Sequence, residues 1–109
     1  MLNQIILVGR IASEVKVETN ENGKKIAKMT IAIPRSFKNE NGEYDTDFID
    51  VRLFDSVATN TSEYCKKGDI VGVKGRIQSN DIEKFHVKMR VIEVMAERVT
   101  FLSSKSNNE

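Results

Sequence analysis

The sequence predicts an all-β fold in which about five strands form a small barrel and one short helix interrupts the series. Three observations support this. Apolar residues alternate with polar ones in several separate segments, Asn-Gly pairs fall between segments, and only one stretch has helical spacing. The 109 residues, 39% of them hydrophobic, suit one domain with a modest core and are too few for two.

The first predicted strand covers residues 3–9, which are apolar on both faces. This pattern is typical of a strand that is buried on two sides or paired at an interface. Gly9 permits a sharp bend or a bulge, and residues 11–18 continue in an extended conformation.

The second strand is predicted over residues 25–33, directly after a hairpin turn at Asn22 and Gly23, which both accept positive φ. Pro34 has no amide hydrogen and is expected to end this strand. Residues 35–47 hold few apolar side chains and a second Asn-Gly pair, which predicts a hairpin arm or a mobile loop. The third strand follows over residues 48–54.

Residues 55–67 change to helical spacing, with apolar side chains on one side. Asp55 or Ser56 is expected to cap the first turn. At the other end, Lys66 and Lys67 suit the helix dipole, and Gly68 suits a left-handed cap.

The last two strands are predicted over residues 69–77 and 84–95, joined by a polar connection at residues 78–83. The apolar phase shifts by one residue late in the second of these, so we expect a bend or bulge near Val91. Val99 and Phe101 are interpreted as a short terminal segment.

Five bent strands with a helix between the third and fourth are typical of the Greek-key barrel called the OB fold. Another small antiparallel α+β domain is the alternative that periodicity leaves open. The expected domain covers residues 1–102, and residues 103–109 are expected to form a short polar tail.

Composition and motifs argue against several classes of function. The net charge of +1 excludes a histone-like polycation, so any anion site must come from local segregation of charge. Cys65 and His86 are each the single residue of their type, which argues against a disulfide or a Cys/His zinc site within one chain. With no nucleotide-binding motif, no signal peptide and no apolar run long enough to cross a bilayer, the sequence predicts a cytoplasmic protein that is not an enzyme and uses no metal or cofactor.

The third strand is the most informative segment. Alternation places Ile49, Val51 and Leu53 on one face, and Phe48, Asp50, Arg52 and Phe54 on the other. A core needs only one of these faces, so the other presents rings and a guanidinium on which unpaired nucleobases can stack. The alternative is that these rings belong to a second small core or a subunit interface.

A second combination of ring and cations, Arg35, Phe37 and Lys38, occurs in the polar segment before this strand. Further cations on or near strands are candidates for a basic track that contacts phosphates, although each alone is more often a solvated surface charge. The predicted phosphate contacts are Lys74, Arg76, Lys84 and Lys88, and Lys28 and Arg90 are further candidates.

The order and spacing of several segments closely resemble the bacterial single-stranded DNA-binding protein family. These segments are residues 1–10, 37–39 with 42–43, 47–49, 64–68 and 73–77. The resemblance implies an OB-fold subunit that forms a homotetramer and binds and protects single-stranded DNA in replication, recombination and repair. It also implies base stacking on Phe37, Phe48 and Phe54, and subunit pairing through residues 3–8.

The chain departs from the family pattern in three ways. It has no Trp where the family often has one, so each stack is expected to be weaker. Ile82 and Arg90 stand where the family often has aromatic residues, so the last hairpin is expected either not to bind or to rely more on charge. The family usually ends in a long linker with an acidic tip, whereas only residues 103–109 remain here, so recruitment of replication and repair enzymes is expected to be weak or absent. An OB-fold adaptor of the primosome type, and an RNA-binding OB-fold protein, are the alternatives.

Overall fold

The computed structural model describes residues 1–104. Its elements are β1 (Ile5–Ile11), β2 (Lys16–Thr19), β3 (Lys25–Lys38), β4 (Tyr44–Phe54), α1 (Asp55–Tyr64), β5 (Ile70–Lys84) and β6 (Val87–Ser103).

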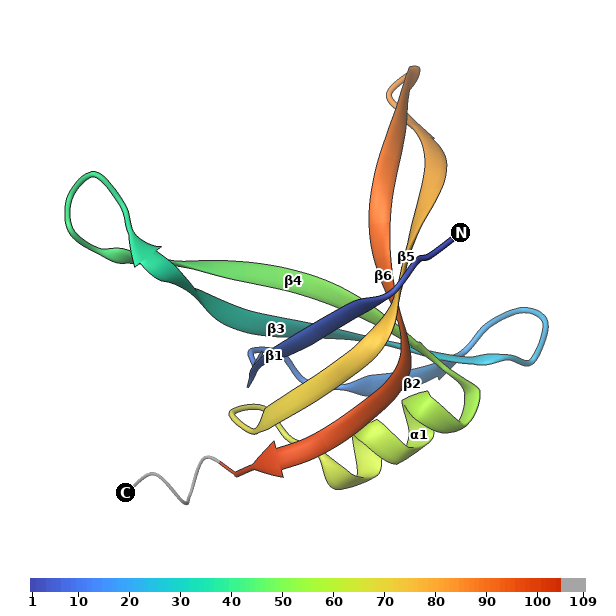
Figure 1. Ribbon diagram of the computed structural model, residues 1–109. Coiled ribbons are helices and arrows are strands. Elements are labelled where there is room, and N and C mark those ends of the chain that lie inside the picture. Colours follow the sequence, from blue (N-terminus) through green and yellow to red (C-terminus); the bar gives the residue numbers. More distant parts are fainter. Residues whose placement is uncertain (105–109) are drawn as a thin grey trace.

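The strands form one sheet that closes on itself. Their order is β1-β5-β6-β4-β3-β2, and an additional pairing of β1 with β3 joins the two sides. All pairings are antiparallel except that of β4 with β6, which is parallel. Two hairpins, β3–β4 and β5–β6, extend beyond the barrel as arms in different directions (Figure 1). This closure confirms the predicted OB-fold barrel over the alternative of another small antiparallel α+β domain.

The barrel interior is filled by one face of each strand. Met29, Ile31, Val51, Leu53 and Val71 are fully buried. On β4, the predicted inward set of residues 49, 51 and 53 is confirmed, because position 49 packs against the core and the other two lie within it. Burying these side chains is the main stabilisation of the barrel, at about 1.5–3 kcal/mol for each large aliphatic residue.

Closure depends on a close approach of β1 to β3. A Cβ atom added at Gly9 would lie 2.7 Å from the carbonyl oxygen of Ala32, so only glycine fits there. The first strand is also divided, since β1 ends at Ile11 and the extended conformation resumes only with β2. In the gap, the Oγ atom of Ser13 accepts a hydrogen bond from the Thr30 amide at 3.0 Å, which keeps the segment against β3.

One prediction about the β3–β4 arm is wrong. Pro34 does not end its strand, because β3 continues to Lys38 and Pro34 lies opposite Thr46. The missing amide is tolerated there because the pairing with β1 has already ended, and the register with β4 shifts between Pro34 and Lys38. Of the two possibilities for residues 35–47, the structure shows the hairpin arm.

Two predictions about the β5–β6 arm are also wrong. Residues 78–83 are not a connection but part of β5, which continues to Lys84, and the turn is formed by Phe85 and His86. Because this arm projects into solvent, its strands need no apolar core face and can be polar. Similarly, β6 runs without a break through the predicted terminal segment to Ser103.

The predicted bulge near Val91 is also wrong, because Val91 pairs regularly with Asn80. The prediction treated Ile92 as a core residue, but its side chain is mostly exposed. The register of β5 with β6 shifts instead at two other places. Lys74 pairs with Arg98 and Gly75 with Ala96, and nearer the end of β6 Ile70 pairs with Ser103 and Val71 with Phe101, so each shift leaves one extra residue on β6.

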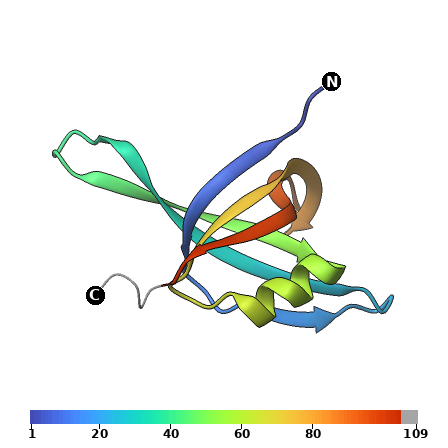
Figure 2. The same cartoon turned by 60° about the horizontal axis from the view of Figure 1, so that its bottom comes forward.

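The helix α1 packs against β2, β3, β4 and β6 and covers one end of the barrel, with Ala58 and Thr61 buried (Figure 2). It is shorter than predicted, because it ends at Tyr64, so Lys66 and Lys67 lie beyond its last turn. The predicted caps are wrong. Phe54 occupies the N-cap position without a side-chain hydrogen bond, and the C-cap is Cys65. The Gly68 amide instead donates to the Ile11 carbonyl at 2.8 Å, which ties this loop to β1.

Within residues 1–104, no helix is long and apolar enough to span a membrane. The predicted tail begins within β6, at Ser103, and its last residues, 105–109, lie outside the described part of the chain.

Candidate nucleic-acid interface

The outer face of β4 carries the predicted rings. Phe48 is 65% exposed, whereas Phe54, at the end of the strand, is half-buried. Both residues point away from the core, so the predicted alternation of faces is confirmed. Phe48 lies opposite Ala32 on β3, a small residue that leaves the ring uncovered on that side.

The charged residues between these rings are held by neighbours. The Asp50 carboxylate accepts a hydrogen bond from the Thr30 hydroxyl at 2.7 Å. Arg52 does not pair with Asp50; its Nε atom lies 2.5 Å from a carboxylate oxygen of Glu93 on β6. Asn80 donates to the other oxygen of Glu93, so this carboxylate connects three strands. Arg52 is therefore fixed at the β4–β6 seam with its side chain still partly exposed to solvent.

A groove of about 310 Å³ lies beside Phe54 on the same face. It is lined by Glu14, Lys16, Glu18, Ile26, Ala27, Lys28, Arg52 and Phe54. Lys16, Lys28 and Arg52 are successive partners across β2, β3 and β4, so three cations form a row across this surface. Lys24, in the turn that joins β2 to β3, places its ammonium 4.8 Å from the centre of the Phe54 ring.

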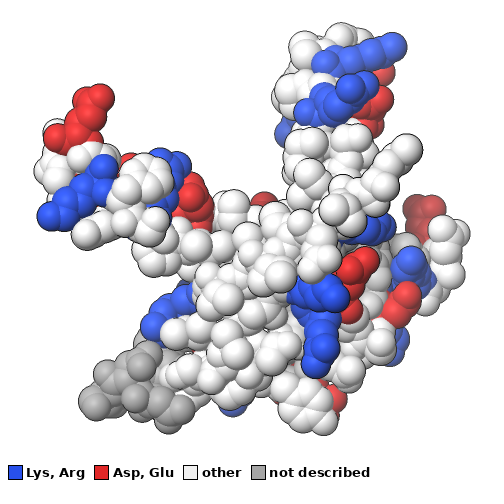
Figure 3. All heavy atoms as spheres, in the orientation of Figure 1, with Lys and Arg blue, Asp and Glu red and all other residues white. Residues whose placement is uncertain are grey.

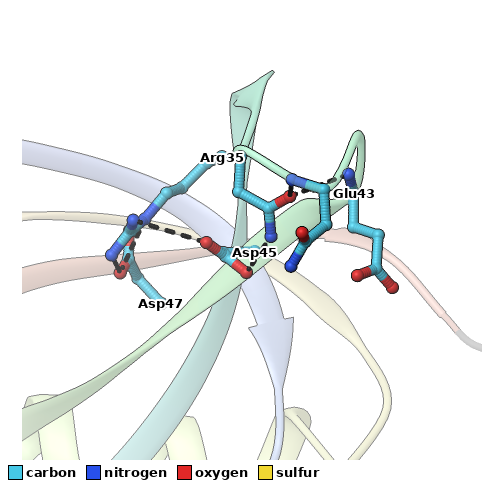
Figure 4. A network of polar contacts seen from close by, with 6 residues as sticks. Arg35, Glu43, Asp45 and Asp47 are labelled. Carbon is cyan, nitrogen blue, oxygen red and sulfur yellow. Dashed lines mark hydrogen bonds and ion pairs between the residues drawn. The ribbon is translucent and has the colours of Figure 1, made fainter.

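The β3–β4 arm brings the second predicted group together only in part. Phe37 is 63% exposed near the end of the arm. Arg35 faces Asp47 and Asp45 on β4, as Figure 4 shows, with Nη2 2.8 Å from an oxygen of Asp47. The Lys38 ammonium lies 5.9 Å from the Tyr44 ring centre, which adds an exposed ring that the sequence analysis missed.

The polar contacts on this arm shift the pKa values of Asp47 and Arg35. Hydrogen bonding to Arg35 holds the pKa of Asp47 below its ordinary value, and the same contact raises the pKa of Arg35. Both groups therefore stay charged at neutral pH, and Arg35 is engaged with carboxylates rather than free for a phosphate.

The β5–β6 arm separates two predicted residues. Lys84 lies opposite Val87, on the face that also carries Ile82 and Met89, whereas Lys88 lies opposite Glu83 on the other face. On that second face, Arg90 pairs with Asp81 at 3.1 Å. Charges of both signs therefore mix on this arm, as the upper part of Figure 3 shows.

The tip of this arm presents another ring that the sequence analysis missed. Phe85 is 86% exposed, and the Lys84 ammonium lies 5.7 Å from its ring centre. Phe85 falls within the strand predicted over residues 84–95, and no local signal marks a turn there because neither Phe85 nor His86 is a usual turn residue.

Lys74 and Arg76 lie apart from the rings of β4, because β6 separates β5 from β4. Lys74 is exposed opposite Ile6 on β1, and Arg76 donates to the side chain of Gln78 at 2.7 Å. Mostly uncharged surface surrounds this region over β1 and β5 (Figure 3). The predicted basic residues therefore lie on several separate surfaces and do not form one continuous basic track.

Cys65 is buried beside the end of α1. Burial, and secondarily the nearby charge of Asp69, raises the pKa of its thiol, so it remains protonated at neutral pH. A buried, protonated thiol suits a structural role rather than that of a nucleophile.

Comparisons with known proteins agree with this geometry. Residues 2–102 match the model of the Single-strand binding protein family. Single-stranded DNA-binding protein B of Bacillus subtilis is 41% identical over 106 residues, which cover 96% of this chain and 94% of that protein. A Single-stranded DNA-binding protein of Staphylococcus aureus is 38% identical over 110 residues, covering 100% of this chain and 70% of that protein.

A solved structure of Plasmodium falciparum SSB in complex with ssDNA has the same fold, with a TM-score of 0.81 at 22% identity. The superposition covers 94% of this chain and 96% of that chain. The chain therefore belongs to the single-strand binding protein family.

Proposed function

We propose that this protein binds single-stranded DNA with little regard to sequence and protects it during replication, recombination and repair in the bacterial cytoplasm. It does so without catalysis, by stacking bases on exposed rings and by contacting phosphates with Lys and Arg. The observation that carries the proposal is Phe48, a ring 65% exposed on the outer face of a strand whose inner face fills the core.

Stacking explains the preference for single strands. Bases of a duplex already stack on each other, whereas unpaired bases offer free faces to Phe37, Phe48 and Phe54. Every base has such a face, so this contact does not read sequence. With a net charge of only +1, we expect stacking to supply more of the affinity than in a strongly basic protein.

The test is a titration of dye-labelled oligo(dT) followed by fluorescence anisotropy at several salt concentrations. We expect saturable binding with log affinity falling against log salt by about 0.7 for each phosphate neutralised. A duplex of the same length should bind much more weakly. Equal affinity for duplex and oligo(dT), or no binding of either, would reject the proposal, and tighter binding of oligo(rU) would indicate an RNA-binding protein instead.

We further propose that the chain assembles as a homotetramer through the outer surface of β1 and its neighbours. Ile6 and Val8 are exposed on β1, and Leu102 on β6 lies over Gly72, which has no side chain to hold it away. Such a contiguous apolar surface suits a subunit interface. Native mass spectrometry should give four chains, and Val8→Lys should reduce that number; a wild-type monomer would contradict this assembly.

A further inference from the structure

The contact between Lys24 and Phe54 is unusual for a surface meant to receive bases. The ammonium lies over the ring at 4.8 Å from its centre and so occupies a face on which a base would stack. At a solvent-accessible site, a contact between a cation and a ring is weaker than the stacking of a base on that ring. An incoming base can therefore displace the lysine from the ring.

The backbone of Lys24 is fixed in place. Its amide donates to the Asn20 side chain at 2.9 Å, and its carbonyl accepts from the Asn20 amide at 2.9 Å. Gly23, at φ 79°, supplies the left-handed conformation that this turn needs. Displacing the ammonium therefore requires only a change of side-chain rotamer, and the charge stays beside the ring.

The surroundings favour an anion there. Lys24, Ile26 and Lys28 share the outer phase of their segment, and Ile26 lies opposite Phe54. The charged residues that line the groove beside the ring are three cations, Lys16, Lys28 and Arg52, and two carboxylates, Glu14 and Glu18. Arg52 is held by Glu93, whereas the Lys24 ammonium lies over the stacking ring and forms no ion pair within residues 1–104.

We propose that Lys24 is a phosphate-binding residue of the interface. When a base stacks on Phe54, the Lys24 ammonium leaves the ring and pairs with the phosphate next to that base. The inference rests on the proposed function and adds a contact that the predicted set of binding residues does not include.

Salt-dependent binding of oligo(dT) tests this directly. Lys24→Ala should make the slope of log affinity against log salt less negative by about 0.7, the loss of one phosphate contact, and should weaken binding at low salt. Lys24→Arg should restore the slope. The matched control is Lys25→Ala, which removes the same charge one residue away, on the opposite phase of the strand, and should leave the slope close to that of the wild type.

Two different results would contradict this inference and the proposed function. If the wild type binds oligo(dT) and Phe48→Ala weakens it, but Lys24→Ala leaves the slope unchanged or tightens binding, then Lys24 only shields the ring and this inference is wrong. If the wild type does not bind oligo(dT), the proposed function itself fails. Lys24 is exposed, so its variants should unfold at the wild-type temperature, which thermal unfolding can verify.

Discussion

Arg35 on β3 and Asp47 on β4 form a two-point ion pair across the β3–β4 arm. The Nη2 atom of Arg35 lies 2.8 Å from Oδ1 of Asp47, and its Nε atom lies 3.1 Å from Oδ2. Arg35 also reaches Asp45 at 3.8 Å. The pair joins the two strands of the arm close to where the register between them shifts.

This pair should make the arm sensitive to acid. The pKa of Asp47 is lowered in the folded protein, so the stabilisation is complete above the ordinary value of 3.8 and is lost as pH falls through the lowered pKa. Asp47→Asn should therefore be less stable at neutral pH and lose less stability on acidification. Urea unfolding between pH 7 and pH 2 measures this, and the effect should be small because both groups are solvent-exposed.

Arg35→Gln provides the matched control, since it removes the other partner. It should flatten the same part of the pH profile, and the double variant should differ little from either single one. Additive effects of the two substitutions would show that the ion pair does not couple these residues.

Phe48→Ala should weaken oligo(dT) binding by about 1–3 kcal/mol, because it removes one stacking ring. Since the ring is largely exposed, the melting temperature should hardly change. Tyr64→Ala is the control: Tyr64 is a similarly exposed ring that lies at the end of α1 and not on β4, and its loss should leave affinity unchanged. If both variants lost the same affinity for oligo(dT), Phe48 on the β4 face would contribute no more than any other exposed ring.

Gly75→Ala should destabilise the barrel by about 3 kcal/mol or more, because an added Cβ would lie 2.0 Å from the Met95 carbonyl oxygen. Gly72→Ala is the natural comparison on the same strand. Its Cβ would meet only Leu102, at an ordinary 3.7 Å, so stability should stay within about 1 kcal/mol of the wild type. Urea unfolding measures both, and similar stabilities would show that β6 can move away from β5 at this point.

His86→Gly should stabilise the β5–β6 arm by about 1 kcal/mol. His86 has φ 64° and Phe85 has φ 53°, a conformation in which a side chain is strained and glycine is not. Hydrogen exchange of the amides in β5 and β6 near the turn should slow in this variant. Faster exchange would mean that the His86 side chain stabilises the turn more than its backbone conformation strains it.

Alternation and turn signals were enough to predict the barrel and its inner face. They correctly separated Val51 and Leu53, in the core, from Phe48 and Arg52 on the outer face, because side chains on a strand must alternate. The same reasoning failed where strands leave the barrel. There no core imposes an apolar face, so polar residues 78–83 resembled a loop although they are paired along β5.

What the sequence by itself determined is which side chains can share a face, and hence that rings and cations lie outside the core. Only the tertiary structure decided what each outer side chain meets across strands. It engaged Arg35 with Asp47, fixed Arg52 with Glu93 and placed Lys24 over Phe54. The physical reason is that alternation along one strand is a local property of the backbone, whereas these contacts depend on strand register and on how the barrel closes.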